Sequence, residues 1–213
     1  MSLIDLIQNR QAAADRTISG VAIAIVTNNQ DPEGQARVKV KYPWRDSEDE
    51  SFWARIATPM AGGERGAYFL PEVGDEVLIA FENGNIDYPY VLGSLWSGSM
   101  KPPESNSDGK NNRRLIKSRS GHLIILDDSD GQEKIEIIDK SGSNKITIDT
   151  SGNTISIESA KDIQLKAPNG KITLEALQLE MKSQTAAKIE AGANMDLKAN
   201  ANMTIKGAMV MIN

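Results

Sequence analysis

Pairs of aliphatic residues recur along the second half of this chain at short, nearly regular intervals. In NKITIDTSGNTISIESAKDIQLKAPNGKITLE, which begins at Asn144, one polar residue separates the two members of each pair. Because side chains alternate between the faces of a strand, both members face one side and the residue between them faces the other. A strand this short cannot bury one face alone, so neighbouring strands must cover it. We therefore predict stacked short strands around a narrow aliphatic core.

The repeat continues toward the C-terminus. Successive pairs mostly begin eight to ten residues apart, with one short interval of five between Ile172 and Leu177. One chain can coil with three strands in each turn, or three chains can wind together so that each supplies one wall of a prism. The pattern alone leaves both arrangements open, although the repeats are few for a long single-chain coil. The predicted core positions are Ile135, Ile137, Ile146, Ile148, Ile155, Ile157, Ile163, Leu165, Ile172, Leu174, Met195, Leu197, Met203 and Ile205.

Aromatic residues divide the chain into two parts. All ten lie between Tyr42 and Trp96, and none follows. Because aromatic side chains fill large volumes in a core, their absence indicates a core only one or two aliphatic side chains wide in the second part. The boundary is a polar stretch with a Pro-Pro pair that starts at Ser97, which predicts a linker. We assign residues 97–115 to this linker and 116–213 to the repeat.

The region before the linker has the pattern of a small all-β domain. About five short apolar segments between residues 18 and 96 are separated by turns rich in Gly, Pro and Asp, which is typical of a closed barrel. Closure is favoured because a small open sheet exposes its edges. We predict a five-stranded barrel of the OB type over residues 18–96.

Residues 1–17 have helical spacing instead. Ser2 is a suitable N-cap with Asp5 three residues later, and Leu3, Leu6 and Ile7 form an apolar stripe. Such a helix either packs on its own domain or docks on another protein. The predicted fold class is therefore all-β, with an N-terminal helix, an OB-type barrel and a C-terminal β-helix.

Charge and composition exclude several functional classes. The net charge is −5 and the pI is about 5.1, which gives no overall electrostatic attraction to nucleic acid or to an anionic membrane. The chain has no cysteine, so disulfides and thiolate chemistry are excluded. The first residues lack the pattern of a secretory signal, and no apolar run is long enough to span a bilayer. We expect synthesis and folding in the cytoplasm.

Several motifs, in this order, resemble one family. These are DPEGQARVKVKYPW, then SFWARIATPMAGGERGAYFLPEVGDEVLIAFENGNIDYPYVLGSLWSG, then SRSGH ahead of the aliphatic repeat. Their order is similar to the OB domain and first β-helix strands of phage baseplate spike proteins and of the valine-glycine repeat protein G of type VI secretion. The resemblance covers residues 18–212 and is specific as a composite.

The resemblance implies a structural role. Such proteins are the central spikes of contractile tails and injection machines, and the β-helix is an intertwined homotrimer that pierces a target envelope. It implies no catalytic residue and no cofactor, because the linker is too short for the lysozyme domain of some relatives. With about seventeen residues before the barrel, we expect a separate hub protein, bound through Leu3, Leu6 and Ile7. The particle would be a phage tail, a phage-derived bacteriocin, a free injection device or a secretion system.

The distal end of the repeat is apolar and rich in methionine. Three copies would gather Met209, Met211 and Ile212 at one end of the prism, and exposed apolar patches of this kind signal a partner. The resemblance implies a conical tip protein of the proline-alanine-alanine-arginine repeat type. Some relatives end in a His-x-His metal site, which this chain lacks, so we expect no metal; the alternative is that these residues form only the last core layer.

The other motifs lack the residue patterns of metal-binding, phosphate-binding or catalytic sites. His122 is the only histidine, and DDSDG (from Asp127) lacks the ligand pattern of an EF-hand. RRLIKSR (from Arg113) is a short basic run, and AGGERG (from Ala61) is no phosphate loop. Two rival functions stay open: a barrel that binds single-stranded nucleic acid, and a carbohydrate-binding or carbohydrate-cleaving β-solenoid. Residues 1–115 contain 12 Lys and Arg against 16 Asp and Glu, which disfavours the nucleic-acid alternative.

Overall fold

The computed structural model describes residues 18–45 and 50–211. Within them the secondary structure is nearly all β, with one short 3-10 helix, η1 (Glu82–Gly84). No helix among these residues is long and apolar enough to cross a membrane. The predicted N-terminal helix over 1–17, with Leu3, Leu6 and Ile7, and the predicted tip residue Ile212 lie outside the described residues. The chain divides into two units, residues 1–160 and 161–213, which are described separately.

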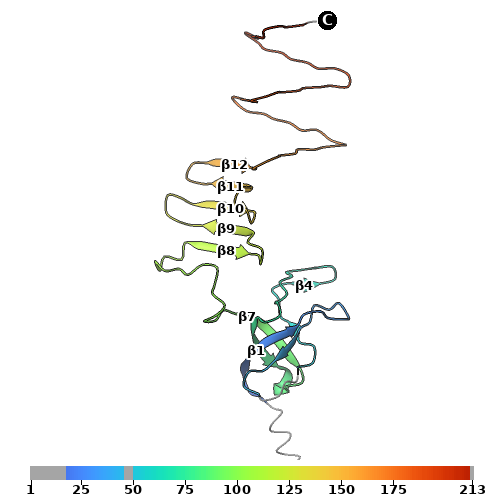
Figure 1. Ribbon diagram of the computed structural model, residues 1–213, viewed down its shortest axis with the longest axis vertical. Helices are drawn as coiled ribbons and strands as arrows, with labels where there is room; N and C mark the ends of the chain where they lie inside the picture. The colour runs from blue at the N-terminus through green and yellow to red at the C-terminus, as the bar shows by residue number, and fades with distance from the viewer. Residues whose placement is uncertain (1–17, 46–49, 212–213) are drawn as a thin grey trace, which may run out of the picture. The chain divides into compact units, whose positions relative to one another are not determined.

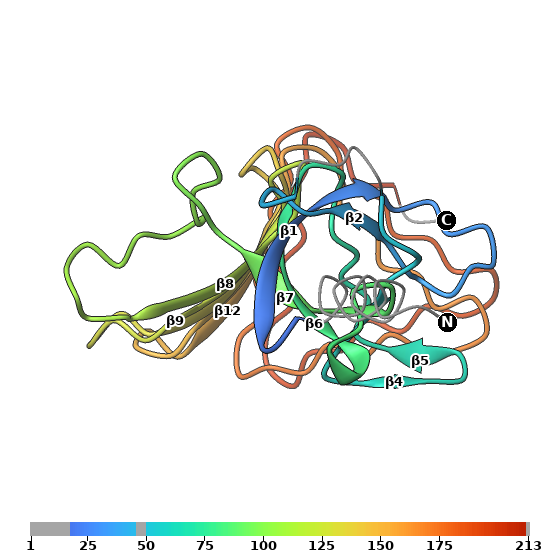
Figure 2. The same cartoon turned by 90° about the horizontal axis from the view of Figure 1, so that it is seen from below.

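The first unit begins with a five-stranded curled sheet (Figures 1 and 2). Neighbouring strands are antiparallel except β3 and β7, which are parallel. Reciprocal backbone hydrogen bonds between Val38 and Ala54 join the two ends of the sheet, so the sheet closes on itself. Its strands in order are β2 (Lys39–Lys41), β1 (Val21–Asn28), β6 (Glu76–Phe81), β7 (Pro89–Leu95) and β3 (Arg55–Ile56).

Alternation along the strands builds the core of this barrel. In β6 every second side chain points inward, so that Val77 and Ile79 are fully buried and Phe81 nearly so. Tyr42 packs beside Phe81 with ring centroids 5.8 Å apart, and burial raises its pKa to about 12. The buried hydrophobic residues are Ala24, Val26, Val38, Val40, Tyr42, Ala54, Val77, Ile79, Phe81, Ile86 and Val91.

Two loops of the barrel have their own local structure. A hairpin of β4 (Ala61–Gly62) and β5 (Arg65–Gly66) forms a separate two-stranded sheet. In the loop after β1, the Asp31 carboxylate accepts hydrogen bonds from the Arg37 guanidinium at 2.7 and 2.8 Å and from the backbone N–H groups of Glu33 and Gln35. The Arg37 contact is the main reason that the pKa of Asp31 lies far below its usual range. This pair fixes the loop that leads into β2.

A second five-stranded sheet follows, seen as the ladder of short arrows in Figure 1. Each strand pairs antiparallel with its sequence neighbour. Residues with positive φ stand in all four connections: Gly121 (103°), Gly131 (70°), Gly142 (74°) and Asn153 (49°). The left-handed conformation suits Gly and Asn and lets a short loop reverse the chain. The strands are β8 (Arg113–Lys117), β9 (Leu123–Asp127), β10 (Lys134–Ile138), β11 (Lys145–Asp149) and β12 (Thr154–Glu158).

This sheet differs from the sequence prediction in two respects. Strand β8 starts at Arg113, before the predicted boundary of the repeat at residue 116. Residues 113–158 also pair within one chain, whereas an intertwined β-helix was predicted over 116–213. Short strands with one apolar face have the same two-residue alternation in both arrangements, so the periodicity does not distinguish them. The connecting loops decide which one forms.

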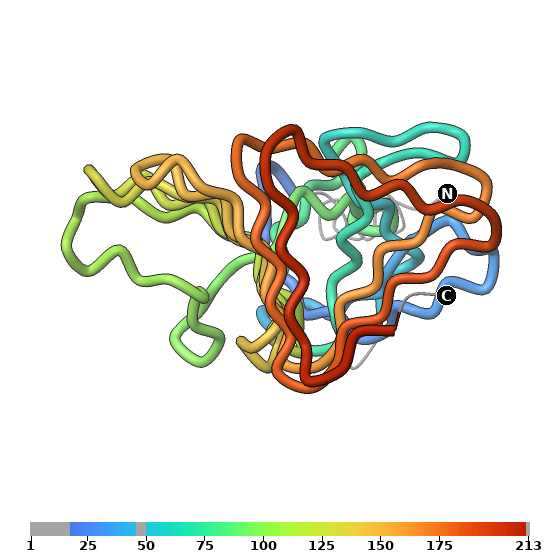
Figure 3. The backbone as a smooth tube through the Cα atoms, turned by 90° about the horizontal axis from the view of Figure 1, so that it is seen from above, coloured from blue at the N-terminus to red at the C-terminus, as the bar shows by residue number. Residues whose placement is uncertain are grey.

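The second unit, residues 161–211 as described, contains no strand. The chain winds in successive turns, drawn from orange to red in Figures 1 and 3. Within this stretch the backbone makes one backbone–backbone hydrogen bond, from the Gly170 N–H to the Ala167 carbonyl at 3.2 Å. All of its described side chains are exposed. The N–H and C=O groups of such an extended backbone form hydrogen bonds with water or with strands of other chains.

Candidate functional site: an exposed aliphatic face

The pairing of β8 to β12 places aliphatic side chains in two rows on one face of the sheet. Directly opposite residues on neighbouring antiparallel strands point to the same side, and residues two apart on one strand share that side. The first row is Ile116, Ile124, Ile137, Ile146 and Ile157. The second row is Arg114, Leu126, Ile135, Ile148 and Ile155. Nine of these ten side chains are aliphatic, and we call this surface the aliphatic face.

The aliphatic face is uncovered in the single chain. Exposure of its nine aliphatic residues ranges from 41% at Ile146 and Ile148 to 72% at Ile155. Scattered exposed aliphatic residues are normal in soluble proteins, but a contiguous set of this kind marks an interaction surface. The one charged member, Arg114, stands at the end of its row and forms an ion pair with Asp128.

The opposite face of the same sheet is mostly polar. Three ion pairs lie there: Arg113 with Asp127 at 3.7 Å, Lys134 with Glu136 at 3.1 Å, and Lys145 with Glu158 at 3.2 Å. Such exposed pairs contribute little to stability individually, but they keep this side hydrated. Toward β8 it also holds the buried Ile125. The sheet therefore has one face suited to water and one that is not.

The structure brings together six of the fourteen predicted core positions. Ile135, Ile137, Ile146, Ile148, Ile155 and Ile157 all lie on the aliphatic face. The other eight, Ile163, Leu165, Ile172, Leu174, Met195, Leu197, Met203 and Ile205, belong to the second unit and are exposed. Among the predicted tip residues, Met209 and Met211 are 78% and 81% exposed. The assignment of all these residues to a trimer core or a tip stays a prediction.

Sequence reasoning missed three members of the face. Ile116 stands in RRLIK, and Ile124 and Leu126 stand in LIILD. In both strands aliphatic residues are consecutive, so the alternation is hidden. The sequence could have revealed Ile124 and Leu126. Counting residues back from Ile137 and Ile135 across one short loop places them directly opposite these two residues.

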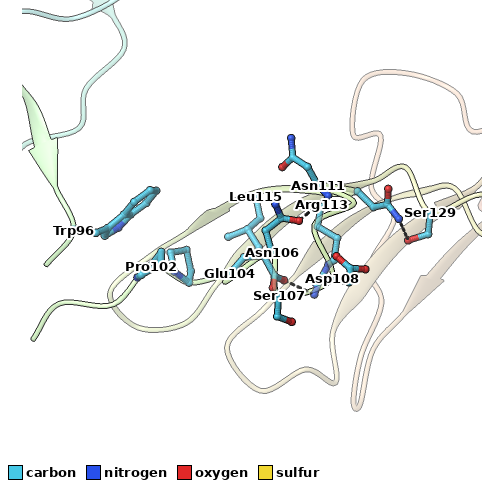
Figure 4. Close-up of a pocket in the computed structure, with 12 residues that line it drawn as sticks. Trp96, Pro102, Glu104, Asn106, Ser107, Asp108, Asn111, Arg113, Leu115 and Ser129 are labelled. Carbon is cyan, nitrogen blue, oxygen red and sulfur yellow. Dashed lines mark hydrogen bonds and ion pairs between the residues drawn. The ribbon is translucent and has the colours of Figure 1, made fainter. Parts of the chain in front are cut away.

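A pocket of about 420 Å³ lies where the predicted linker meets the second sheet (Figure 4). Trp96 and Ser129 stand at opposite ends of it, and Leu115 lies between them. The linker has an ordered conformation here: Glu104 pairs with Arg113 at 2.9 Å, and the Asn106 carboxamide accepts a hydrogen bond from the Asn111 N–H at 2.7 Å. The lining contains serine hydroxyls but no histidine, cysteine or lysine to activate them.

Other candidate sites have structural partners. The exposed His122 accepts a hydrogen bond at Nδ1 from the Lys140 N–H at 3.2 Å. In the DDSDG turn, Asp127 accepts hydrogen bonds from the Ser129 hydroxyl and N–H, and the hydroxyl contact is the main cause of its lowered pKa. Among the residues that the structure describes, no three His, Cys, Asp or Glu side chains are grouped to hold a metal ion.

A cation–aromatic cluster on the barrel surface is built around Trp53. The Arg37 guanidinium and the Lys39 ammonium lie 5.9 and 5.5 Å from the centre of the Trp53 ring. Both cations also have carboxylate partners, Asp31 at 2.7 Å and Glu50 at 3.1 Å. A basic groove for nucleic acid needs cations free to meet phosphates, and these two are already paired.

Comparison with known proteins identifies the barrel. Residues 22–96 match the family described as the type VI secretion system/phage-baseplate injector OB domain. These are the residues that form the closed five-stranded sheet. Residues 22–96 carry the OB domain of this family. The resemblance predicted from the motif order is thereby confirmed, and the barrel is an OB domain.

Individual relatives of the family align over a little more than half of the chain. The chain is 28% identical over 139 residues to the type VI secretion system spike protein VgrG3 of Vibrio cholerae, and 30% identical over 135 residues to VgrG5 of Pseudomonas aeruginosa. These alignments cover 62% and 55% of this chain but only 13% and 17% of those relatives. A further relative, the actin cross-linking toxin VgrG1 of Vibrio cholerae, is 29% identical over 133 residues, 55% of this chain and 12% of that protein. The chain thus spans less than a fifth of the length of these relatives.

Proposed function

We propose that this chain is the structural central spike of a contractile tail or injection machine. In this proposal residues 1–17 dock on the baseplate hub, residues 18–96 form the OB barrel, and the chain from β8 onward contributes to a trimeric spike that pierces the target envelope. The observation that carries the proposal is the aliphatic face, which follows an injector OB domain in the same chain. Its site of action is the baseplate of a phage tail or a phage-tail-like particle.

Three copies of the chain would bury the aliphatic face and would pair the backbone of residues 161–211. The nine exposed aliphatic residues of the sheet would turn toward one another and leave the ion-paired face outside. The backbone of residues 161–211, with its single internal hydrogen bond among the described residues, would pair with strands of the other two chains. Edge strands β8 and β12 favour the same assembly, because each has one unpaired side.

An intertwined prism suits a mechanical task. Its unfolding requires that three chains separate together, and this gives a high kinetic barrier. The narrow aliphatic core makes a slender object, and the lysine, aspartate and serine residues between the pairs keep it hydrated. A slender spike concentrates the force of a contracting tail on a small area of membrane, so puncture requires no catalysis.

The two ends of the spike would bind different partners. A baseplate hub protein would bind Leu3, Leu6 and Ile7. At the other end Met209, Met211 and Ile212 would bind a tip protein of the proline-alanine-alanine-arginine repeat type. The high exposure of Met209 and Met211 supports an apolar contact there, and methionine adapts its shape to a partner.

The mass of the purified full-length chain in solution tests the proposal. Multi-angle light scattering at micromolar concentration should give three times the chain mass of 23.2 kDa. Ile155→Asp should abolish the trimer, because three carboxylates would meet in one dry layer. Ser156→Asp is the matched control, because Ser156 neighbours Ile155 but points to the opposite face. A stable monomer, or equal trimer yield from both variants, would refute the trimeric spike.

The partner assignments need a separate measurement. Deletion of residues 1–16 should abolish co-purification with the hub and leave the trimer intact. Met209→Asp combined with Met211→Asp should release the tip protein and keep the trimer soluble. If hub binding survives the deletion, the contact belongs to the barrel surface, where Tyr68 and Phe69 are exposed. Undiminished tip binding would show that residues other than Met209 and Met211 make the tip contact.

A further inference from the structure

The outer surface of the OB barrel is apolar on strand β1. In this strand every second side chain points inward, and the inward residues include two small ones, Ala22 and Ala24. The larger Val21 and Ile23 point outward and are 56% and 47% exposed. Outward positions of an antiparallel sheet with one face in water are normally polar. The barrel core therefore does not explain why these two residues are aliphatic.

The neighbouring strands extend this apolar surface. Ile23 lies directly opposite Leu78 of β6, and Val21 lies opposite Ala80. Directly opposite residues of an antiparallel pair point to the same side of the sheet. On β7 the pairing shifts beside Leu78, and the extra residue there, Leu92, is 44% exposed. We call Val21, Ile23, Leu78, Ala80 and Leu92 the barrel patch.

The chain enters the barrel at one end of the barrel patch. The Ile18 N–H donates a hydrogen bond at 2.8 Å to the carbonyl of Gly84, which follows the end of β6 that carries Ala80. Gly20 then has a φ of 96°, a conformation that glycine adopts without strain and that turns the backbone before β1. Residues 1–17 are therefore attached next to the patch, and the turn at Gly20 allows them to run back along β1.

Residues 1–17 have the pattern and the length to cover the barrel patch. In a helix Ile7 would lie about 17 Å before Ile18, at ~1.5 Å per residue. Ile23 lies at most about 17 Å beyond Ile18, because an extended chain rises ~3.3 Å per residue. A helix that runs back along β1 can therefore bring Ile7 to Ile23. The aliphatic residues at helical spacing in this segment are Leu3, Leu6 and Ile7.

Attachment to the same chain makes a small patch sufficient. Two separate proteins bury about 1,200 Å² or more in a stable, specific interface. The barrel patch offers far less, since only three of its five side chains are about half exposed. A segment of the same chain acts at an effective concentration in the millimolar range, so a contact of millimolar affinity is already populated. The patch therefore suits the chain's own segment better than a free partner.

We propose that residues 1–17 pack on the barrel patch of their own chain and so cover Leu3, Leu6 and Ile7 until the baseplate hub binds them. The same three residues make the proposed hub contact, so the release by the hub rests on the proposed function. One apolar stripe cannot contact the barrel and the hub together, and the two contacts therefore exclude each other. In the free chain the barrel patch keeps this stripe from non-specific association.

Disulfide trapping tests the contact with the barrel, because the chain has no cysteine of its own. Ile7→Cys is combined with Leu78→Cys in the barrel patch, and the full-length chain is incubated with oxidised glutathione. The control pair is Ile7→Cys with Phe52→Cys. Phe52 is 66% exposed and stands at the seam between β2 and β3, on the far side of the closed sheet from its middle strand β6.

We expect the Leu78 pair to cross-link within one chain, about tenfold faster than the Phe52 pair. Equal rates for the two pairs would overturn the proposal, and so would cross-links that join two chains. Ile23→Thr removes apolar surface from the patch but keeps a β-branched side chain in the strand, so it should slow the Leu78 cross-link severalfold. An unchanged rate in Ile23→Thr would show that the barrel patch does not hold the segment.

The release step has its own measurement. The hub protein that co-purifies with the chain should slow the Leu78 cross-link severalfold when it is added in excess. If the hub binds and the cross-link rate does not change, the two contacts are compatible and the release step is wrong. A chain that forms no trimer and binds no hub would refute the proposed function, whereas the intrachain cross-link would still decide the contact with the barrel.

Discussion

Truncation of Ile137 measures whether the aliphatic face is buried in the working protein. Ile137 is the middle residue of its row, opposite Ile124 and Ile146, and is 50% exposed in the single chain. Ile137→Ala removes three carbon groups, about 2.4 kcal/mol at ~0.8 kcal/mol for each when burial is complete. With half of the side chain already in water, a monomer would lose only about 1 kcal/mol. In a closed trimer the transfer and cavity terms together would cost about 2–5 kcal/mol per chain.

Denaturant unfolding at several protein concentrations separates these two cases. A trimer unfolds at a midpoint that rises with protein concentration, since unfolding releases three chains. We expect Ile137→Ala to lower stability by more than about 2 kcal/mol per chain and to retain that dependence on concentration. Ile138→Ala is the matched control, because Ile138 is next in sequence, points to the opposite face and pairs with Leu123 and Lys145. A loss near 1 kcal/mol, with a midpoint independent of concentration, would show that the face is open to solvent.

Three further predictions address local stability. Ile79→Val in the fully buried barrel core should cost about 1 kcal/mol and lower the unfolding temperature of the barrel by about 4–8 °C, measured by calorimetry. The pKa of Asp139 is lowered to about 2, chiefly by the Ser141 hydroxyl and also by Asn144. Its stabilising effect is therefore full above its unfolded pKa near 4 and fades as pH falls toward 2, so the difference in unfolding temperature between wild type and Asp139→Ala should shrink over that range. The Thr147 hydroxyl is buried with no hydrogen-bond partner in the described part of the chain; Thr147→Val should raise stability by about 1 kcal/mol in denaturant titrations.

The barrel was predictable from sequence because its strands alternate clearly. Val38, Val40 and Tyr42 stand at every second position before a turn, and all three are buried. The closing contact between Val38 and Ala54 was not predictable, because a single bridge leaves no periodic signal. The ordered linker was missed for a similar reason. Its conformation depends on pairs such as Glu104 with Arg113, and a stretch of polar residues gives no sign of which of them will meet.

The site was predictable in part, since the alternation showed which residues share a face. It did not show which strands are neighbours. Ile146 and Ile155 stand nine residues apart, as do Ile163 and Ile172. The first two belong to adjacent strands of one chain, whereas the second two lie in a segment without strands. Spacing therefore shows which residues can share a face but says little about whether the partner strand comes from the same chain.

The difference between the two units lies in the backbone of the loops. Up to Asn153 the connections between strands contain residues in the left-handed conformation, such as Gly142 at 74°, and the chain reverses at each of them. Among the described residues after Asn153, none has a positive φ. The connections there contain Gly170, Gly192 and Gly207, so glycine is available but is not used to reverse the chain. Without reversal, a strand cannot pair with its sequence neighbour, and its hydrogen bonds must go to water or to another chain. Apolar pairs continue after this point, so it is the loops that separate the self-paired sheet from the segment whose backbone groups are left for water or for another chain.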